Sequence, residues 1–148
     1  MSSTATRITK KHEVKSFLQQ AHIARMATVD PGTLQPHVVP VWYEWDGETL
    51  WISSFRSTRK VKEIQKNSHI SVVVDTDSPA EPARAVVFEG EAELISDPGE
   101  GLSRGGSIYT RYLGIEGVQG EEPQSWLHDP EHLLIALKPR KIYAWGFG

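Results

Sequence analysis

Alternating apolar and polar side chains identify the middle of the chain as strand-forming. Residues 36–45 are rich in Val, Trp and Tyr, which suit a pleated and partly buried surface, and we predict a strand there. The pair Asp46-Gly47 follows, which is typical of a type I′ turn because both central positions of that turn need positive φ. Residues 50–52 are apolar again and return antiparallel. The pattern therefore predicts a β-hairpin around which the rest of the chain is organised.

After this hairpin the period of the pattern changes from two to that of a helix. Val61 and Ile64 lie three positions apart among charged residues, which indicates a short basic helix with Ser57 or Thr58 as its N-cap. Free N–H groups, hydroxyls and two cations at one helix start suit an anion, phosphate above all. A solvated surface helix whose Lys and Arg only confer solubility is the alternative. The residues alone leave both interpretations open.

The flanking segments predict further strands and a few helices. An apolar stripe at helical spacing, with Val14, Phe17 and Leu18, indicates a first helix, and residues 1–8 before it are expected to be frayed. Gly90 suggests a bulge, and Glu89, Glu91 and Glu93 share a face that we expect to be solvated. Residues 69–75 are predicted to form a strand that is buried on both faces. The further predicted strands are residues 23–29, 69–75, 85–94, 132–137 and 141–145, and the further helices are residues 97–113 and 123–127.

Composition narrows the class of protein. The chain has 148 residues with 39% hydrophobic content, which suits one domain over residues 1–148 with a real core. The absence of cysteine excludes disulfides, thiolate metal sites and cysteine nucleophiles, and agrees with a reducing, cytoplasmic setting. A net charge of −3 gives no general attraction to nucleic acid. Neither a leader pattern nor an apolar run near the ~20 residues of a membrane helix is present, so no membrane partner is expected.

The motifs in the sequence do not support a metal site, a serine hydrolase or a Rossmann dinucleotide site. The six histidines are scattered, and Asp129-Pro130 interrupts any helix that would join His128 to His132, so no metal site is predicted. No G-x-S-x-G elbow is present, which argues against a serine hydrolase. No G-x-G-x-x-G follows a strand, which argues against a Rossmann dinucleotide site.

The positions of the tryptophans limit which of them can lie in the core. Trp51 stands between Leu50 and Ile52, and we expect it in the core. Trp42 and Trp45 have opposite parity, so both cannot face the core of one regular strand. One of them is therefore left for solvent, for a cofactor ring or for a subunit interface.

The order of these segments resembles a known family. The segment HIARMATVDPGTLQPHVVPVWYEWDG, followed by a strand ending in Ser-Ser and by STRKVKEI, resembles the pyridoxamine-phosphate-oxidase-like split β-barrel family, especially its flavin and deazaflavin oxidoreductase branch. The likeness runs from about residue 17 to residue 94 and continues more weakly to residue 145. It implies a mainly β fold: a six- or seven-stranded, mostly antiparallel split β-barrel with peripheral helices. It also implies a homodimer with the cofactor in a groove between the subunits.

The resemblance further implies an activity and a set of cofactor-binding residues. The cofactor is FMN or the deazaflavin coenzyme F420, and a hydride passes between its reduced form and a small organic acceptor. Surplus cations beyond the phosphate favour the deazaflavin, which carries an anionic tail. No catalytic side chain is assigned, and the chain ends without the Arg-x-His segment that pyridoxine chemistry would need. A haem-binding or haem-degrading relative and a non-enzymatic cofactor carrier are the alternatives. The ring is expected against Val39, Pro40, Val41 and Trp42, and the phosphate against Ser53, Ser54, Thr58, Arg59 and Lys60.

Overall fold

The computed structural model of the chain describes residues 8–9, 11–76 and 78–147. Residues 1–7 of the predicted frayed N-terminus lie outside this part, and Ile8 packs against the core. The helices are α2 (His12–Gln19), α3 (Arg59–Lys66), α4 (Pro98–Gly117) and α5 (Glu121–Leu127). The strands are β1 (Ala24–Val29), β2 (Pro36–Val41), β3 (Tyr43–Trp45), β4 (Leu50–Phe55), β5 (His69–Asp75), β6 (Ala85–Ile95), β7 (His132–Leu137) and β8 (Lys141–Trp145).

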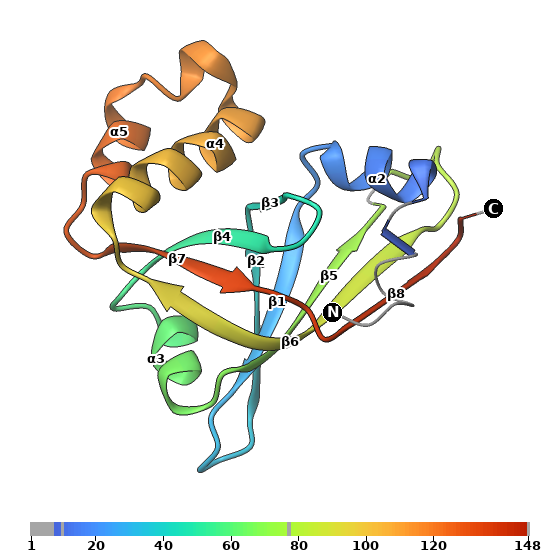
Figure 1. Cartoon of the computed structure of the whole chain (residues 1–148), viewed down its shortest axis with the longest axis horizontal. Helices are drawn as coiled ribbons and strands as arrows, with labels where there is room; N and C mark the ends of the chain where they lie inside the picture. Colours follow the sequence, from blue (N-terminus) through green and yellow to red (C-terminus); the bar gives the residue numbers. More distant parts are fainter. Residues whose placement is uncertain (1–7, 10, 77, 148) are drawn as a thin grey trace.

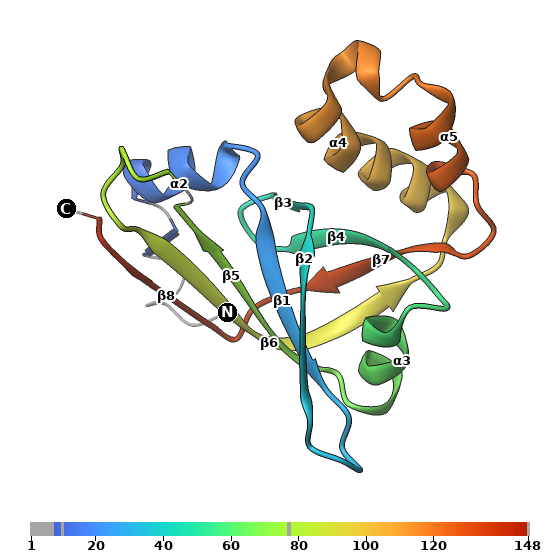
Figure 2. The same cartoon turned by 180° about the vertical axis from the view of Figure 1, so that it is seen from behind.

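All the strands belong to one antiparallel sheet that curls on itself. Their order is β2-β1-β5-β6-β7-β4-β3, with β8 paired to β6. The two ends of this order, β2 and β3, are consecutive in the chain, so the sheet has to bend round into a split barrel (Figures 1 and 2). The predicted class, mainly β with peripheral helices, is confirmed.

The predicted strand over residues 36–45 is divided at Trp42, which raises the seven predicted strands to eight in the described part of the chain. β2 pairs with β1 and β3 pairs with β4, so the chain changes neighbours at this residue. Helix α4 satisfies the backbone groups at the corner, because the Tyr43 N–H donates to the Tyr112 hydroxyl at 3.2 Å and Arg111 Nε donates to the Tyr43 carbonyl at 3.0 Å. Barrel closure therefore overrides the local strand pattern here.

The hairpin between β3 and β4 is present, but its turn differs from the predicted type I′. Trp45 pairs with Leu50, which leaves a four-residue loop, and within the described residues only its glycine, Gly47, has positive φ there, at 99°. The Asp46 carboxylate accepts from the N–H groups of Glu48 and Thr49 at 2.8 and 2.7 Å. The aspartate side chain, and not a positive φ at Asp46, closes this turn.

The strand buried on both faces is β7, and not the predicted residues 69–75. β5 alternates between buried and partly exposed positions, because nothing covers its outer face in the described chain. Every residue of β7 is buried, since one of its faces points into the barrel and the other lies under α4 and α5. The position of the covering helices decides this difference, and the strand sequences alone do not show it.

Gly90 marks a corner and not a bulge. The β5–β6 register runs through it without an extra residue, from Ile70↔Gly90 to His69↔Glu91. A Cβ at Gly90 would lie 3.1 Å from the Arg140 backbone nitrogen, where β6 exchanges β8 for β7 as its neighbour. The predicted glutamate face of β6 does point to solvent, with Glu91 and Glu93 exposed.

Two apolar layers hold the fold together. The barrel interior contains the buried stripe of α2, as predicted, together with the inward residues of the strands. A second layer, with Trp51, Ile108 and Leu134, lies between α4 and the outer faces of β4 and β7. Helix α4 begins as predicted, with the Asp97 carboxylate accepting from the Glu100 N–H at 2.9 Å and Pro98 at the first position.

Candidate functional site

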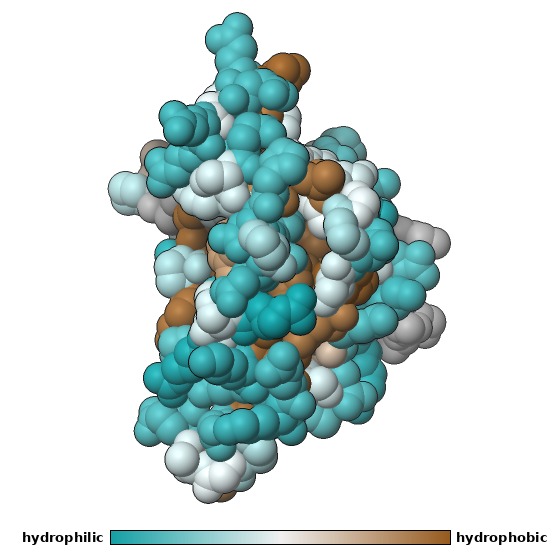
Figure 3. Space-filling view, turned by 90° about the vertical axis from the view of Figure 1, so that its left-hand side faces the viewer, coloured by the Kyte–Doolittle hydropathy of each residue, from teal (hydrophilic) through white to brown (hydrophobic). Residues whose placement is uncertain are grey.

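A cavity of about 500 Å³ lies where the end of β2, strand β4 and the helices α3, α4 and α5 meet. Figure 3 looks at the side from which these helices project, and hydrophobic surface gathers in its middle between hydrophilic surfaces above and below. The volume falls within the ~300–1,000 Å³ typical of small-molecule sites. The residues that line the cavity are Ile23, Pro40, Val41, Trp42, Ser53, Phe55, Lys60, Tyr109 and Trp126.

Aromatic rings form one wall of this cavity. Trp42 stacks on Tyr112 with ring centroids 4.7 Å apart and packs edge-to-face against Tyr109 and Trp126. The division of the predicted strand at Trp42 turns this ring toward α4, whereas Trp45 packs against Phe88 of the barrel core. The two tryptophans pack against different apolar layers, as expected, although the division of the strand at Trp42, and not the parity of one regular strand, separates them. Trp42 is the one that lines the cavity. Trp51 is buried, as predicted.

Lys60 is the cation of this cavity. It is half-buried at the start of α3, and among the described residues no carboxylate forms an ion pair with it. Burial lowers the pKa of its ammonium group, because the charged form loses hydration without gaining a counter-charge. An anionic ligand bound beside Lys60 would supply the missing counter-charge.

Arg59 does not share this position, although the sequence suggested that the two cations lie at one point. Its Nε donates to Glu63 Oε2 at 3.0 Å, and it lines a different hollow with Asp30 and Lys62. Successive helical residues point about 100° apart, so neighbours in sequence face different surroundings. The structure thus brings Lys60, but not Arg59, to the cavity.

The hydroxyl residues are divided in a similar way. Ser53 lines the cavity, whereas Ser54, the next residue of β4, is buried on the other face with its hydroxyl 3.3 Å from that of Thr58. Thr58 occupies the predicted N-cap position, but its hydroxyl donates to the Phe55 carbonyl at 2.9 Å and caps no helix N–H. Of the residues assigned to the ring, Pro40, Val41 and Trp42 line the cavity and Val39 packs against the barrel core.

Sequence reasoning missed Tyr109, Trp126 and His132. The Ser53 Oγ lies 2.7 Å from the Tyr109 hydroxyl and 2.8 Å from His132 Nε2. Burial raises the pKa of Tyr109, partly offset by the bond to Ser53, and burial lowers the pKa of His132, partly offset by the negative charge of Asp129. The available signal for His132 was a polar residue at the head of the otherwise apolar run HLLIAL.

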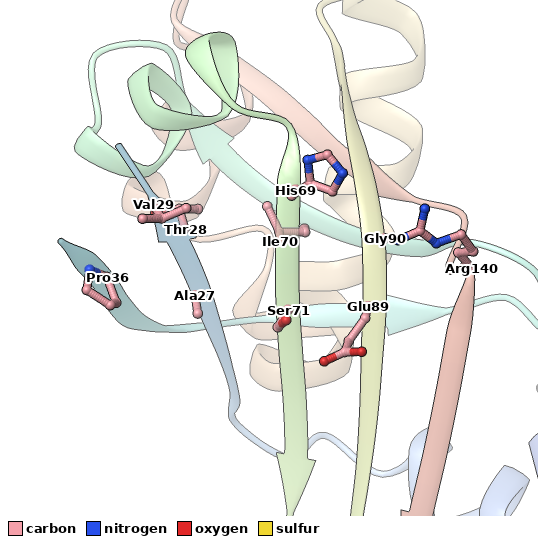
Figure 4. A pocket seen from close by; sticks show the side chains of 10 residues that line it. All are labelled: Ala27, Thr28, Val29, Pro36, His69, Ile70, Ser71, Glu89, Gly90 and Arg140. Atoms are coloured by element: carbon pink, nitrogen blue, oxygen red, sulfur yellow. The ribbon is translucent and has the colours of Figure 1, made fainter. Parts of the chain in front are cut away.

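A second hollow, of about 350 Å³, lies on the outer face of β1, β5 and β6 (Figure 4). Ala27, Ser71 and Glu89 stand in one row across these strands, and Arg140 borders the hollow from beyond β6. None of the residues assigned to the cofactor lines it, and no Trp, Tyr or Phe does. We therefore take the cavity beside α4 as the candidate site.

The described residues contain neither a candidate metal site nor a candidate membrane-spanning helix. No group of three or more His, Cys, Asp or Glu side chains is arranged to hold a metal ion in that part of the chain. Across the same residues, no helix combines the length and the apolar character needed to cross a bilayer.

Solved structures share this fold. A conserved hypothetical protein from Mycobacterium tuberculosis aligns with a TM-score of 0.75 at 23% identity, over 92% of this chain and 84% of that one. An F420 reductase aligns with a TM-score of 0.67 at 25% identity, over 87% of this chain and 94% of its own. The heme storage protein HutZ from Vibrio cholerae aligns with a TM-score of 0.75 at 18% identity, over 93% and 96% of the two chains.

No curated protein matches the chain. The family model described as pyridoxamine 5'-phosphate oxidase matches residues 11–146, which is nearly the whole sequence. The chain therefore belongs to the pyridoxamine 5'-phosphate oxidase-like family of split β-barrel proteins.

Proposed function

We propose that the protein is an oxidoreductase that uses a flavin or deazaflavin cofactor, bound in the cavity beside α4, to reduce a small organic acceptor. The observation that carries this proposal is the pairing of Lys60, a half-buried cation without a carboxylate partner among the described residues, with a wall of aromatic rings. A flat ring system joined to a phosphate matches both features at once. The likeness to an F420 reductase agrees with this assignment.

The cavity residues divide into three roles toward such a cofactor, which supplies the hydride chemistry when it is bound. Lys60 neutralises the anionic group, and Ser53 offers a hydroxyl beside it. Trp42 and Trp126, which line the cavity, would contact the ring and exclude water from it. The surrounding barrel keeps these groups in place, since Val41 and its neighbours belong to the buried core.

Haem binding fits this cavity less well. The likeness to a heme storage protein concerns the fold. None of the nine residues that line the cavity is a histidine, and the nearby His132 is buried with its Nε2 next to Ser53. A haem iron in this cavity would need a ligand of another kind.

We also propose that two copies of the chain associate through the outer face of the sheet. The register aligns Val38 with Ala27 in one row and Pro40 with Arg25 and Val73 in the next, and Val38 is 65% exposed. A second copy would cover the apolar members of these rows, among which Arg25 is paired with Asp75 at 2.6 Å. Pro40 belongs to this face and also lines the cavity, which agrees with a cofactor held in a groove between two subunits.

Spectroscopy of the purified protein tests the proposed function. A flavin or deazaflavin band in the visible spectrum is expected, and FMN and coenzyme F420 should be titrated in parallel at low and raised salt. We expect tighter binding of the deazaflavin that weakens with salt, because its anionic tail can reach further cations such as Arg56 and Lys62. Reduction of an acceptor by the loaded protein separates an enzyme from a carrier. A haem Soret band, or failure to bind either cofactor, would overturn the proposal.

A further inference from the structure

Three side chains from three separate elements form a continuous polar line behind the cavity. Tyr109 comes from α4, Ser53 from β4 and His132 from β7. The Ser53 Oγ lies between the other two, 2.7 Å from the Tyr109 hydroxyl and 2.8 Å from His132 Nε2. Both distances are those of good hydrogen bonds. A hydroxyl can donate one bond while accepting another, so Ser53 can join its two neighbours.

The line connects two hollows of the protein. Tyr109 and Ser53 line the candidate cofactor cavity, whereas His132 lines a separate hollow of about 200 Å³ between the first turns of α4 and the segment that joins α5 to β7. The imidazole is held tightly between them, because a Cβ at Gly105 would lie 2.9 Å from its Cε1. Its Nδ1 lies toward Gly101, which also lines the smaller hollow. One end of the line therefore meets the cavity and the other end meets a second opening.

We propose that His132, Ser53 and Tyr109 form a proton relay that supplies the acceptor bound in the cavity, an inference that rests on the proposed function. Reduction of an organic acceptor by hydride uses two electrons, which the reduced flavin or deazaflavin provides, and then one proton. Tyr109 gives that proton as its O–H bond breaks and a bond to hydrogen forms on the acceptor. The Ser53 proton moves to the Tyr109 oxygen, and the Nε2 proton of His132 moves to the Ser53 oxygen. His132 takes up a proton from solvent at Nδ1, so each hydride consumes one proton from water.

The surroundings of His132 suit this role. Burial lowers its pKa and Asp129 opposes that shift only in part, so burial favours the neutral imidazole, which carries one proton to pass on. Phe55 packs against the ring at 5.8 Å, and the Tyr109 ring lies 6.4 Å away on the side of α4. Of the described titratable groups, Asp129 and Tyr109 thus face it from two sides, while His128 lines the same hollow with its Nδ1 next to the Gln124 carbonyl.

Nuclear magnetic resonance of the protein with isotope-labelled histidine tests the line without any cofactor. Tyr109→Phe removes the hydroxyl and keeps the ring, so it should shift the Nε2 resonance of His132 through Ser53, and Ser53→Ala should shift it further. Ser107→Ala is the matched control, since that hydroxyl also lies on α4 but bonds to Glu44 at 2.8 Å. A His132 resonance that responds to Ser53→Ala but ignores Tyr109→Phe would overturn the relay.

Kinetics of the protein with bound cofactor test whether the relay delivers protons during turnover. With menadione as the acceptor, which takes up a hydride and a proton, Tyr109→Phe should lower kcat by about 10²-fold or more while the cofactor Kd changes less than about threefold. Its solvent deuterium isotope effect should change as well. Parental kcat in both Tyr109→Phe and Ser53→Ala would overturn the relay even though the enzyme works. If the parent neither binds cofactor nor reduces menadione, the proposed function fails, and the resonance measurement decides separately whether the relay exists.

Discussion

Neighbouring residues in this chain have different surroundings, and the differences can be measured one side chain at a time. Lys60 lines the candidate cavity, whereas Arg59 is neutralised by Glu63 outside it. Ser53 faces the cavity and Ser54 faces away. Adjacent positions of the same chemical type therefore serve as controls for each other.

Replacing Lys60 should weaken cofactor binding, and replacing Arg59 should not. Lys60→Met keeps the aliphatic stem and removes the charge, so one charge-assisted contact worth about 1.5–3 kcal/mol is lost, or roughly 10- to 150-fold in Kd. Arg59→Ala should change the Kd by less than about threefold. Fluorescence titrations with FMN and coenzyme F420 measure both. Equal weakening by the two substitutions would restore the shared clamp expected from the sequence.

Glu63 should make the stability of the protein depend on pH in acid. The Thr28 hydroxyl, donating at 2.6 Å, and then Arg59 hold the pKa of this buried carboxyl below its usual range, with His37 adding a smaller effect. The resulting stability is complete above the pKa of an unfolded-chain glutamate and is lost as the pH falls through the lower folded-state pKa. Glu63→Gln should therefore flatten the acid limb of a plot of Tm against pH.

Glu93→Gln is the control for that experiment, because Glu93 is exposed on the solvent face of β6. Its acid limb should follow that of the parent. If the curve of Glu63→Gln also runs parallel to the parent between pH 3 and pH 7, the account of the Glu63 network is wrong.

At the scale of elements, helix α4 positions the site. Arg111 donates to the carbonyls of Gln19, Gln20 and Tyr43, which ties the helix to the end of α2 and to the barrel corner. The Tyr112 hydroxyl donates to the His22 carbonyl at 2.6 Å. These bonds fix the position of α4, which presents Tyr109 to the cavity. How closely α4 packs on the barrel therefore determines the shape of the cavity.

Two adjacent glycines of α4 test that packing. Gly105→Ala places a Cβ 2.9 Å from both His132 Cε1 and Leu127 Cδ2, so overpacking of about 1–3 kcal/mol should exceed the ~1 kcal/mol gained in helix propensity. Gly106 has no heavy atom within 4 Å of such a Cβ, and Gly106→Ala should stabilise the protein by about 0.5–1 kcal/mol. Urea denaturation measures both variants. Equal stability of the two would show that α4 does not press on His132.

At the scale of the whole molecule, one face of the sheet with exposed apolar side chains on β2 is left uncovered in the described chain. The helices cover the side that carries the candidate cavity and the ends of the barrel, while the outer face of β1, β2 and β5 carries Val38 and its neighbours (Figure 2). We propose a second copy as its cover, and the mass in solution tests this.

Light scattering at micromolar concentration should give twice 16.6 kDa for the parent. Val38→Glu places a charge in the proposed interface and should yield the single-chain mass. Ile115→Glu is the control, because Ile115 is 79% exposed on α4, away from this face, and the variant should keep the parental mass. A monomeric parent that binds cofactor would remove the intersubunit groove.

Local patterns in the sequence were sufficient for most elements and for the family. The spacing of Val61 and Ile64, the Asp97-Pro98 start and the apolar runs each report on the φ/ψ preference and on one buried face of a short segment, and such properties depend on nearby residues alone. The same reasoning placed Trp42, Ser53 and Lys60 among the candidate residues, and the structure brings these three to one cavity.

Only the tertiary structure decided what those segments contact. The division of the strand at Trp42 follows from barrel closure, and the burial of both faces of β7 follows from the position of α4. Tyr109 and His132 join Ser53 from 56 and 79 residues away, because the register of β4 with β7 and the seating of α4 place them there. A local pattern specifies that a side chain is buried, whereas long-range packing specifies its partners, and this site is made of such partners.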